Sequence, residues 1–205
     1  MKTILCYGDS NTWGLIPGTH ERYPWNTRWT GVLQEMLSGK DIRIIEEGLC
    51  GRTTVFEDSY RENRNGLKTL PLIMETHSPV DAVIIMLGTN DCKECFDLNA
   101  HSVAEGMEKC IDELLKFVSA DKILLVSPIH LGENIWESDP EFNEKSLLTS
   151  SELKREYREL AKRKKLNFLA ASDYAVPSLT DREHMTEQGH KDFAEAVFSS
   201  FANTL

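Results

Sequence analysis

The sequence lacks any long hydrophobic run. No stretch approaches the roughly 18 consecutive apolar residues that a membrane span requires. The apolar run at the N-terminus ends at Tyr7, which makes it too short for the core of a signal peptide, and no small-residue cleavage site follows it. These absences predict a cytoplasmic protein that has no membrane partner.

Cysteine and positive charge are also scarce. The chain has five cysteines, an odd number, which favours a reducing compartment over a disulfide framework. Its 33 acidic residues outnumber the 23 lysines and arginines, so the formal net charge is -10. Because a surface of this charge repels a phosphate backbone, we expect no nucleic-acid partner.

Internal repeats, low-complexity tracts and disordered tails are absent as well. The 205 residues are 40% hydrophobic and 27% charged, which is the composition of an ordinary globular protein. A chain of this length buries roughly 70% of the surface that its unfolded form exposes, so its core needs no metal and no disulfide. We therefore predict a single domain over residues 1–205.

Short apolar runs alternate along the chain with segments of helical periodicity. Strands are predicted at residues 3–7, 42–45, 82–87, 123–126 and 167–170, and helices at residues 29–37, 103–118, 151–165 and 187–201. This alternation predicts an α/β fold, in which helices cover both faces of a parallel sheet. In such sheets ligands bind beyond the carboxyl ends of the strands.

Small polar groups follow the first three predicted strands. Ser10 comes directly after the first strand, Gly51 follows the second, and Asn90 follows the third. Glycine lets the backbone turn sharply and leaves its N–H open to a ligand. A serine hydroxyl becomes a good nucleophile only when a base removes its proton, and histidine is the side chain whose pKa suits that task.

His184 is the strongest candidate for the base. Asp181 lies three residues before it, where a carboxylate can accept a hydrogen bond from Nδ1 and leave Nε2 free for Ser10. His130 also follows a strand but has no neighbouring acid until Glu133, so it ranks second. The sequence contains six histidines in total: His20, His77, His101, His130, His184 and His190.

Each of these groups also has an ordinary structural interpretation. A glycine-aspartate-serine triplet is commonly a turn. The segment before His184 could be a helix start, with Thr180 as N-cap and Glu183 completing a capping box. Asn90 could be a helix cap. Catalysis is favoured by the conjunction, because three candidate groups follow adjacent strands of one sheet and the fourth lies in the last loop.

Four short blocks, in order along the chain, resemble those of the SGNH (GDSL-type) hydrolases: Gly8-Asp9-Ser10, Gly51, Gly88-Thr89-Asn90-Asp91 and Asp181-x-x-His184. The resemblance implies a three-layer α/β/α sandwich around a five-stranded parallel sheet, flavodoxin-like in outline. It also implies Ser10 as nucleophile, His184 as base and Asp181 as its orienting carboxylate. The oxyanion hole would then consist of the Ser10 N–H, the Gly51 N–H and the Asn90 side-chain amide. No metal or organic cofactor is needed.

Longer stretches, at residues 8–14, 28–33, 46–54 and 84–91, resemble the bacterial arylesterase/acyltransferase branch of that family. That branch acts on short acyl esters, can transfer the acyl group to alcohols in water, and forms homo-oligomers. The resemblance implies that Trp13 binds the acyl or alcohol part of a small ester substrate. The other interpretation of Trp13 is a large core aromatic under the first loop.

Two features depart from the pattern of the family. Asn11 follows the nucleophile, where the broad family commonly has leucine, and this change removes no catalytic atom. The segment 131–150, which contains Trp136, Pro140 and Phe142, diverges from the branch. It follows a strand end and is therefore placed to cover the site, so the preferred ester stays open.

Other functions compete with this interpretation. Within the family, a carbohydrate deacetylase or a lysophospholipase shares the chemistry and differs only in pocket shape. Cys92 and Cys95 have the spacing of a thiol-redox or zinc motif, but no second pair with matching spacing accompanies them. A flavodoxin-like binding module needs a phosphate-binding loop after the first strand, and residues 8–14 match neither glycine-rich phosphate motif.

Overall fold

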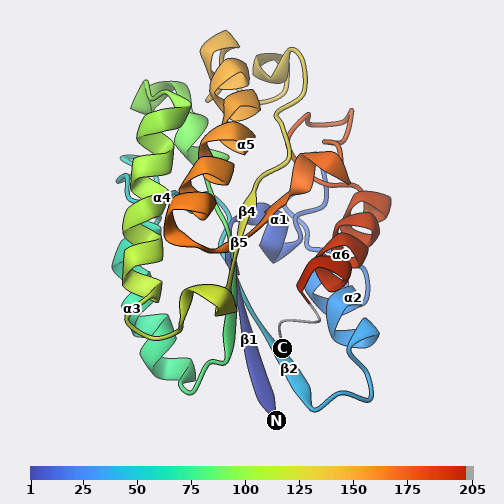
Figure 1. Ribbon diagram of the computed structural model, residues 1–205. Coiled ribbons are helices and arrows are strands. Elements are labelled where there is room, and N and C mark those ends of the chain that lie inside the picture. The colour runs from blue at the N-terminus through green and yellow to red at the C-terminus, as the bar shows by residue number, and fades with distance from the viewer. Residues whose placement is uncertain (202–205) are drawn as a thin grey trace.

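Five parallel strands form one sheet in the order β2-β1-β3-β4-β5 in the computed structural model, which describes residues 1–201 (Figure 1). The strands are β1 (Lys2–Gly8), β2 (Ile42–Gly48), β3 (Ala82–Met86), β4 (Ile123–Ser127) and β5 (Asn167–Ala170). All neighbouring pairs are parallel. Every predicted strand is present, with boundaries that differ by only a few residues.

Helices cover both faces of the sheet, which confirms the predicted three-layer α/β/α architecture (Figure 1). On one face lie α3 (Gly66–His77), α4 (Ala100–Leu114) and α5 (Glu144–Lys164), and on the other lie α2 (Trp29–Met36) and α6 (Glu187–Phe201). A single turn, α1 (Ser10–Trp13), follows β1. None of the helices within residues 1–201 has the length and apolarity that crossing a membrane would require.

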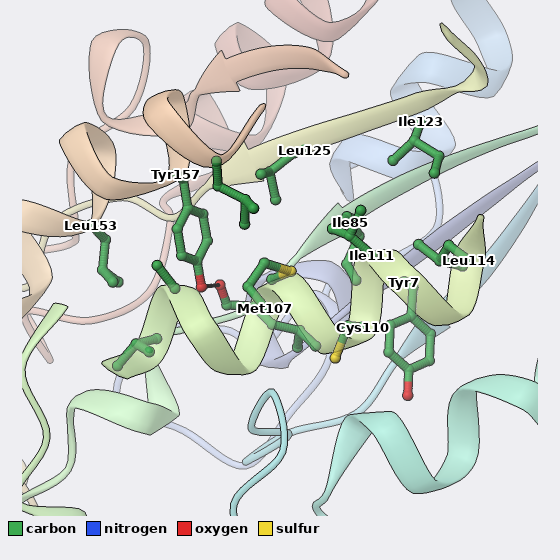
Figure 2. Close-up of a cluster of buried hydrophobic side chains, with 14 of the residues drawn as sticks. Tyr7, Ile85, Met107, Cys110, Ile111, Leu114, Ile123, Leu125, Leu153 and Tyr157 are labelled. Atoms are coloured by element: carbon green, nitrogen blue, oxygen red, sulfur yellow. Dashed lines mark hydrogen bonds between the residues drawn. The ribbon is translucent and has the colours of Figure 1, made fainter. Parts of the chain in front are cut away.

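The core divides into two clusters because side chains alternate between the faces of each strand. In β3, Val83 and Ile85 join the cluster beneath α4 and α5, whereas Ile84 and Met86 join the cluster beneath α2 and α6. Burial on both faces explains why β3 is a continuous apolar run in the sequence. Figure 2 shows the first cluster, in which Ile111 of α4 lies among side chains from the sheet and from α5.

Two helix boundaries differ from the prediction. The predicted helix 103–118 is α4, which ends at Leu114 and begins at Ala100, because Asn99 caps its start by accepting a hydrogen bond from the Ser102 N–H at 2.9 Å. The predicted helix 151–165 begins at Glu144, where Asn143 and Ser146 form a capping box. Residues 144–150 of the segment 131–150 therefore belong to the start of α5.

The helix α3 is absent from the sequence-based prediction. Pro71 lies inside it, and a proline there removes a backbone donor and normally indicates a helix end. The helix forms because Leu70 and Met74 are completely buried against the sheet and because Asn65 caps it, accepting a hydrogen bond from the Lys68 N–H at 3.2 Å. Tertiary burial here outweighs the local penalty.

We expect Ile111→Ala to lower the free energy of unfolding by about 2–5 kcal/mol, because it leaves a cavity in the fully buried cluster of Figure 2. The matched control is Lys109→Ala on the exposed face of the same helix, for which we expect a change within about 0.5 kcal/mol. Urea denaturation followed by circular dichroism measures both. Equal effects would contradict the assigned packing of α4.

Candidate active site

Ser10 stands at the sharp turn where β1 passes into α1. Asp9 caps this turn, and its Oδ1 accepts a hydrogen bond from the Asn11 N–H at 3.0 Å. Gly8 has no space for a side chain, because a Cβ there would lie 2.1 Å from the Thr12 hydroxyl oxygen. The turn therefore depends on glycine at position 8 and places the Ser10 side chain at the carboxyl edge of the sheet.

Ser10, His184 and Asp181 form a continuous hydrogen-bond chain. The Ser10 Oγ lies 2.8 Å from His184 Nε2, and His184 Nδ1 lies 2.8 Å from Asp181 Oδ2. An ionised carboxylate only accepts hydrogen bonds, so Nδ1 carries the proton and donates a hydrogen bond to Asp181. The neutral imidazole then presents Nε2 as the acceptor of the serine hydroxyl, as a general base requires.

Asp181 is itself held by backbone donors. Its Oδ1 accepts hydrogen bonds from the N–H groups of Glu183 and His184, each at 3.1 Å, and its Oδ2 accepts one from Gly18 at 2.9 Å. Residues 181–184 are thus a tight loop closed on the aspartate side chain. The helix-start interpretation with a capping box is wrong, because α6 begins later, at Glu187.

The three expected oxyanion donors lie around the same cavity as His184. Ser10, Gly51 and Asn90 all line it. Gly51 has a φ of +83°, a left-handed conformation that favours glycine. The buried Asn90 amide is oriented by the hydrogen bond that its Nδ2 donates to the Arg52 carbonyl at 3.2 Å. Its second N–H is left for a ligand.

The cavity above Ser10 has a volume of about 580 Å³, and most of the residues that line it are polar or charged. Trp13 lines it and is half-buried, with the guanidinium of Arg22 4.9 Å from its ring centroid. The core-aromatic interpretation of Trp13 is therefore wrong. The remaining apolar side chains of the lining are Leu15 and Cys50.

A charged network, which the sequence did not predict, joins the wall of the cavity to the loops after β2 and β3. Glu141 accepts two hydrogen bonds from the Arg61 guanidinium, at 2.9 and 3.0 Å, and pairs with Lys93 Nζ at 2.6 Å. The Lys93 side chain is only 4% exposed, whereas Glu141 is 28% and Arg61 39% exposed, so solvent screens the Arg61 charge more than the Lys93 charge. The segment 131–150 thus forms one wall of the cavity, to which it contributes Ser138, Asp139 and Glu141.

The electrostatics of the site centre on His184. Burial lowers its pKa, but the charge of Glu183 and the hydrogen bond and charge of Asp181 outweigh burial and raise that pKa to about 9. Burial also raises the pKa of Asp9 to about 7. His184 and two carboxylates that line the cavity with it, Asp181 and Glu183, have shifted pKa values, and such a group of titratable side chains is typical of a functional site.

The other candidate groups lie elsewhere or have unsuitable chemistry. His130 does not line the cavity. Cys92 is buried, and burial raises its pKa well above the ordinary value, which is the opposite of a reactive redox thiol. Over the described part of the chain, no cluster of three or more His, Cys, Asp or Glu side chains is arranged to hold a metal ion.

A Ser-His-Asp set at the carboxyl edge of a five-stranded parallel sheet, inside a three-layer sandwich, defines the class of SGNH hydrolases. The model of the GDSL-like lipase/acylhydrolase family matches residues 6–191, and the chain belongs to this family. No curated protein sequence matches the chain.

Solved structures extend the comparison over the whole chain. The native aryl esterase of M. smegmatis is 36% identical, with a TM-score of 0.92 and 100% coverage of both chains. Est24, a carbohydrate acetylesterase from Sinorhizobium meliloti, is 34% identical with the same TM-score and coverage. A lipolytic protein of the G-D-S-L family from Veillonella parvula, 15% identical with a TM-score of 0.73 over 98% of this chain and 99% of its own, shares the fold.

Asn11 has a role that the sequence did not reveal. Its Oδ1 accepts a hydrogen bond from the Met185 N–H at 2.9 Å, and its Nδ2 donates to the Glu183 carbonyl at 3.5 Å. Both Asn11 and Met185 are buried. The side chain next to the nucleophile thus fixes the backbone on both sides of His184, and its polarity was the only signal of this contact in the sequence.

We expect Asn11→Ala to lower kcat for ester hydrolysis about 10–100-fold, because a small displacement of His184 misaligns the base. The unfolding free energy should fall by about 1–3 kcal/mol, since the buried Met185 N–H loses its acceptor. Steady-state kinetics and urea denaturation measure the two effects. Asn26→Ala, at an exposed asparagine, is the control. Unchanged kcat in Asn11→Ala would show that this contact does not position the base.

Proposed function

We propose that the protein is a carboxylic-ester hydrolase that uses Ser10 as nucleophile, His184 as base and Asp181 as orienting carboxylate. The observation that carries the proposal is the Ser10–His184–Asp181 hydrogen-bond chain, with both links at 2.8 Å, at the floor of an open cavity. Membership of an acylhydrolase family supports it independently.

The first step transfers the acyl group to the enzyme. Ser10 Oγ attacks the ester carbonyl carbon while its proton passes to His184 Nε2. The charge that develops on the carbonyl oxygen is stabilised by the Ser10 N–H, the Gly51 N–H and the Asn90 amide. The tetrahedral intermediate then collapses, the alcohol leaves with the proton from His184, and the acyl group stays on Ser10.

The second step releases the acyl group by the same chemistry in reverse. Water, or a second alcohol, attacks the acyl-enzyme as His184 takes a proton from it. Attack by water yields a carboxylic acid, and attack by an alcohol yields a new ester. No metal or organic cofactor takes part in this mechanism.

Short acyl esters are the substrates that the cavity supports best. Trp13, Leu15 and Cys50 are the apolar side chains of the lining, and polar and charged residues make up the rest, whereas a long acyl chain is bound best by a continuous apolar lining. This disfavours a lysophospholipase. Aryl esterase is the activity named for one similar structure, and a carbohydrate acetylesterase for another.

Deacetylation of a carbohydrate is the second candidate, and the charged side chains of the wall favour it. Arg64 lines the cavity and hydrogen-bonds the carbonyl oxygens of Cys50 and Glu62, each at 2.7 Å, with no carboxylate partner within residues 1–201. A guanidinium has several N–H donors, and they can donate hydrogen bonds to the hydroxyl oxygens of a carbohydrate. Acyl transfer to alcohols, homo-oligomerisation and the cytoplasmic location stay predictions.

Replacing the nucleophile tests the proposed function directly. We expect Ser10→Ala to reduce kcat for p-nitrophenyl acetate about 10⁶-fold, as the loss of a triad serine does elsewhere. A fluorophosphonate probe should label the wild type, with the adduct mapped to Ser10 by mass spectrometry. Ser199→Ala, at an exposed serine of α6, should leave both results unchanged. Near-normal activity of Ser10→Ala would refute the mechanism.

The pH dependence tests the base. Only the neutral imidazole of His184 can accept the serine proton, and its pKa is raised to about 9. We therefore expect kcat/KM to increase about tenfold per pH unit below pH 9 and then to level off. Initial rates, corrected for spontaneous hydrolysis, give this profile. A plateau beginning near pH 6.5 would contradict the influence of the surrounding carboxylates, and a flat profile down to pH 4 would contradict a histidine base.

A further inference from the structure

Glu183 carries a buried carboxylate that the mechanism above leaves without a role. Its side chain is 9% exposed and lines the cavity together with Ser10 and His184. Within the described residues no donor hydrogen-bonds to this carboxylate, and its Oε1 lies 3.9 Å from His184 Nε2, too far for a direct hydrogen bond. Because Glu183 lines the cavity, a ligand in that cavity can donate a hydrogen bond to its carboxylate.

The surroundings of Glu183 favour a neutral ligand with O–H groups. Burial raises the pKa of Glu183, while the positive charges of His184 and Lys93 oppose that rise and the charges of Asp139 and Asp181 reinforce it. Over the alkaline range in which His184 is neutral, the ionised carboxylate can only accept hydrogen bonds. A ligand at this position must therefore donate a hydrogen bond to Glu183 Oε1 and also reach Nε2 of His184.

Water at the base meets this requirement. It carries two O–H groups, and only one of its protons passes to His184 during deacylation. For a water oxygen about 2.8 Å from both His184 Nε2 and Glu183 Oε1, the Nε2–O–Oε1 angle is about 90°. This is close to the angle between the two O–H bonds of water. The separation of 3.9 Å thus fits one water held by His184 and Glu183 together.

We propose that Glu183 is a catalytic residue of deacylation, which holds the attacking water through its second O–H bond and so favours hydrolysis over acyl transfer to simple alcohols. A monohydric alcohol has one O–H, whose proton goes to His184, and nothing is left for Glu183. The inference rests on the proposed acyl-enzyme mechanism and deepens it.

Deacylation transfers the acyl group from Ser10 to this water. The water oxygen forms a bond to the acyl carbon, one O–H bond breaks, and its proton goes to His184 Nε2. The carbonyl electron pair moves to the oxygen held by the oxyanion donors. That pair returns as the bond from the acyl carbon to Ser10 Oγ breaks, and Oγ takes the proton from Nε2. The second O–H stays intact and donates to Glu183 Oε1 until the carboxylic acid leaves.

Competition between water and an alcohol for the acyl-enzyme measures this effect. Wild type, E183L and E183Q are given p-nitrophenyl acetate with 1-butanol, and butyl acetate and acetate are quantified by chromatography. We expect the ratio of butyl acetate to acetate to rise about tenfold or more in E183L, which has no acceptor. It should change less than threefold in E183Q, whose amide oxygen still accepts. The control is E133L, an identical substitution at an exposed position, with an unchanged ratio.

The pH profile separates this role from a purely electrostatic one. Both E183L and E183Q remove the charge beside His184, so the acid limb of kcat/KM should move to lower pH in both. Equal product ratios in wild type and E183L would overturn the proposal, as would equal rises in E183L and E183Q. If E183L does not fold, E183A provides the same test, and we expect the ratio to rise in it as well.

Labelling by the fluorophosphonate probe distinguishes failure of the proposed role of Glu183 from failure of the proposed esterase mechanism. An adduct on Ser10 in the wild type and in E183L, with unchanged product ratios, overturns the role of Glu183 and leaves the esterase mechanism intact. The absence of a Ser10 adduct in the wild type overturns the mechanism and the role of Glu183 together.

Discussion

The hydrogen bond between Ser10 and His184 is the contact on which the whole site depends, and it joins residues 174 positions apart in the chain. It forms only because β1 lies inside the sheet and because the last loop returns to the carboxyl edge. The Asn11 side chain holds the backbone of that loop, and Asp181 ties it to Gly18. Each of these contacts spans a long sequence distance, so the site exists only in the folded chain.

The same loop concentrates negative charge in a buried place. Asp181, Glu183 and Asp9 all raise the pKa of His184, against the effect of burial. Asp9 is itself fully buried, and among the described residues no donor reaches its Oδ2. Such groups oppose folding unless they are paired. In the proposed mechanism they stabilise the imidazolium that forms when Ser10 loses its proton.

The proposed catalytic groups and the wall of the cavity come from different parts of the fold. Ser10 and the proposed oxyanion donors lie just beyond strand ends, whereas Asp181 and His184 lie in the last loop, which contacts with Asn11 and Gly18 hold in place. The wall of the cavity comes from the segment between β4 and α5 and from the loops that Glu141 joins through Arg61 and Lys93. A wall built from loops can change its chemistry without disturbing the triad, which explains how one fold serves aryl and carbohydrate esters among similar structures.

The sequence by itself predicted the alternation of strands and helices and the α/β class, and it indicated Ser10, Asp181 and His184 as a group, because periodicity and short motifs are local signals. It did not predict α3, whose Pro71 opposes a helix until Leu70 and Met74 are buried. Only the tertiary structure decided that Trp13 lines the cavity and that Glu183 lies beside the base. Those facts depend on contacts between distant segments, and burial and charge proximity leave no periodic trace in the sequence.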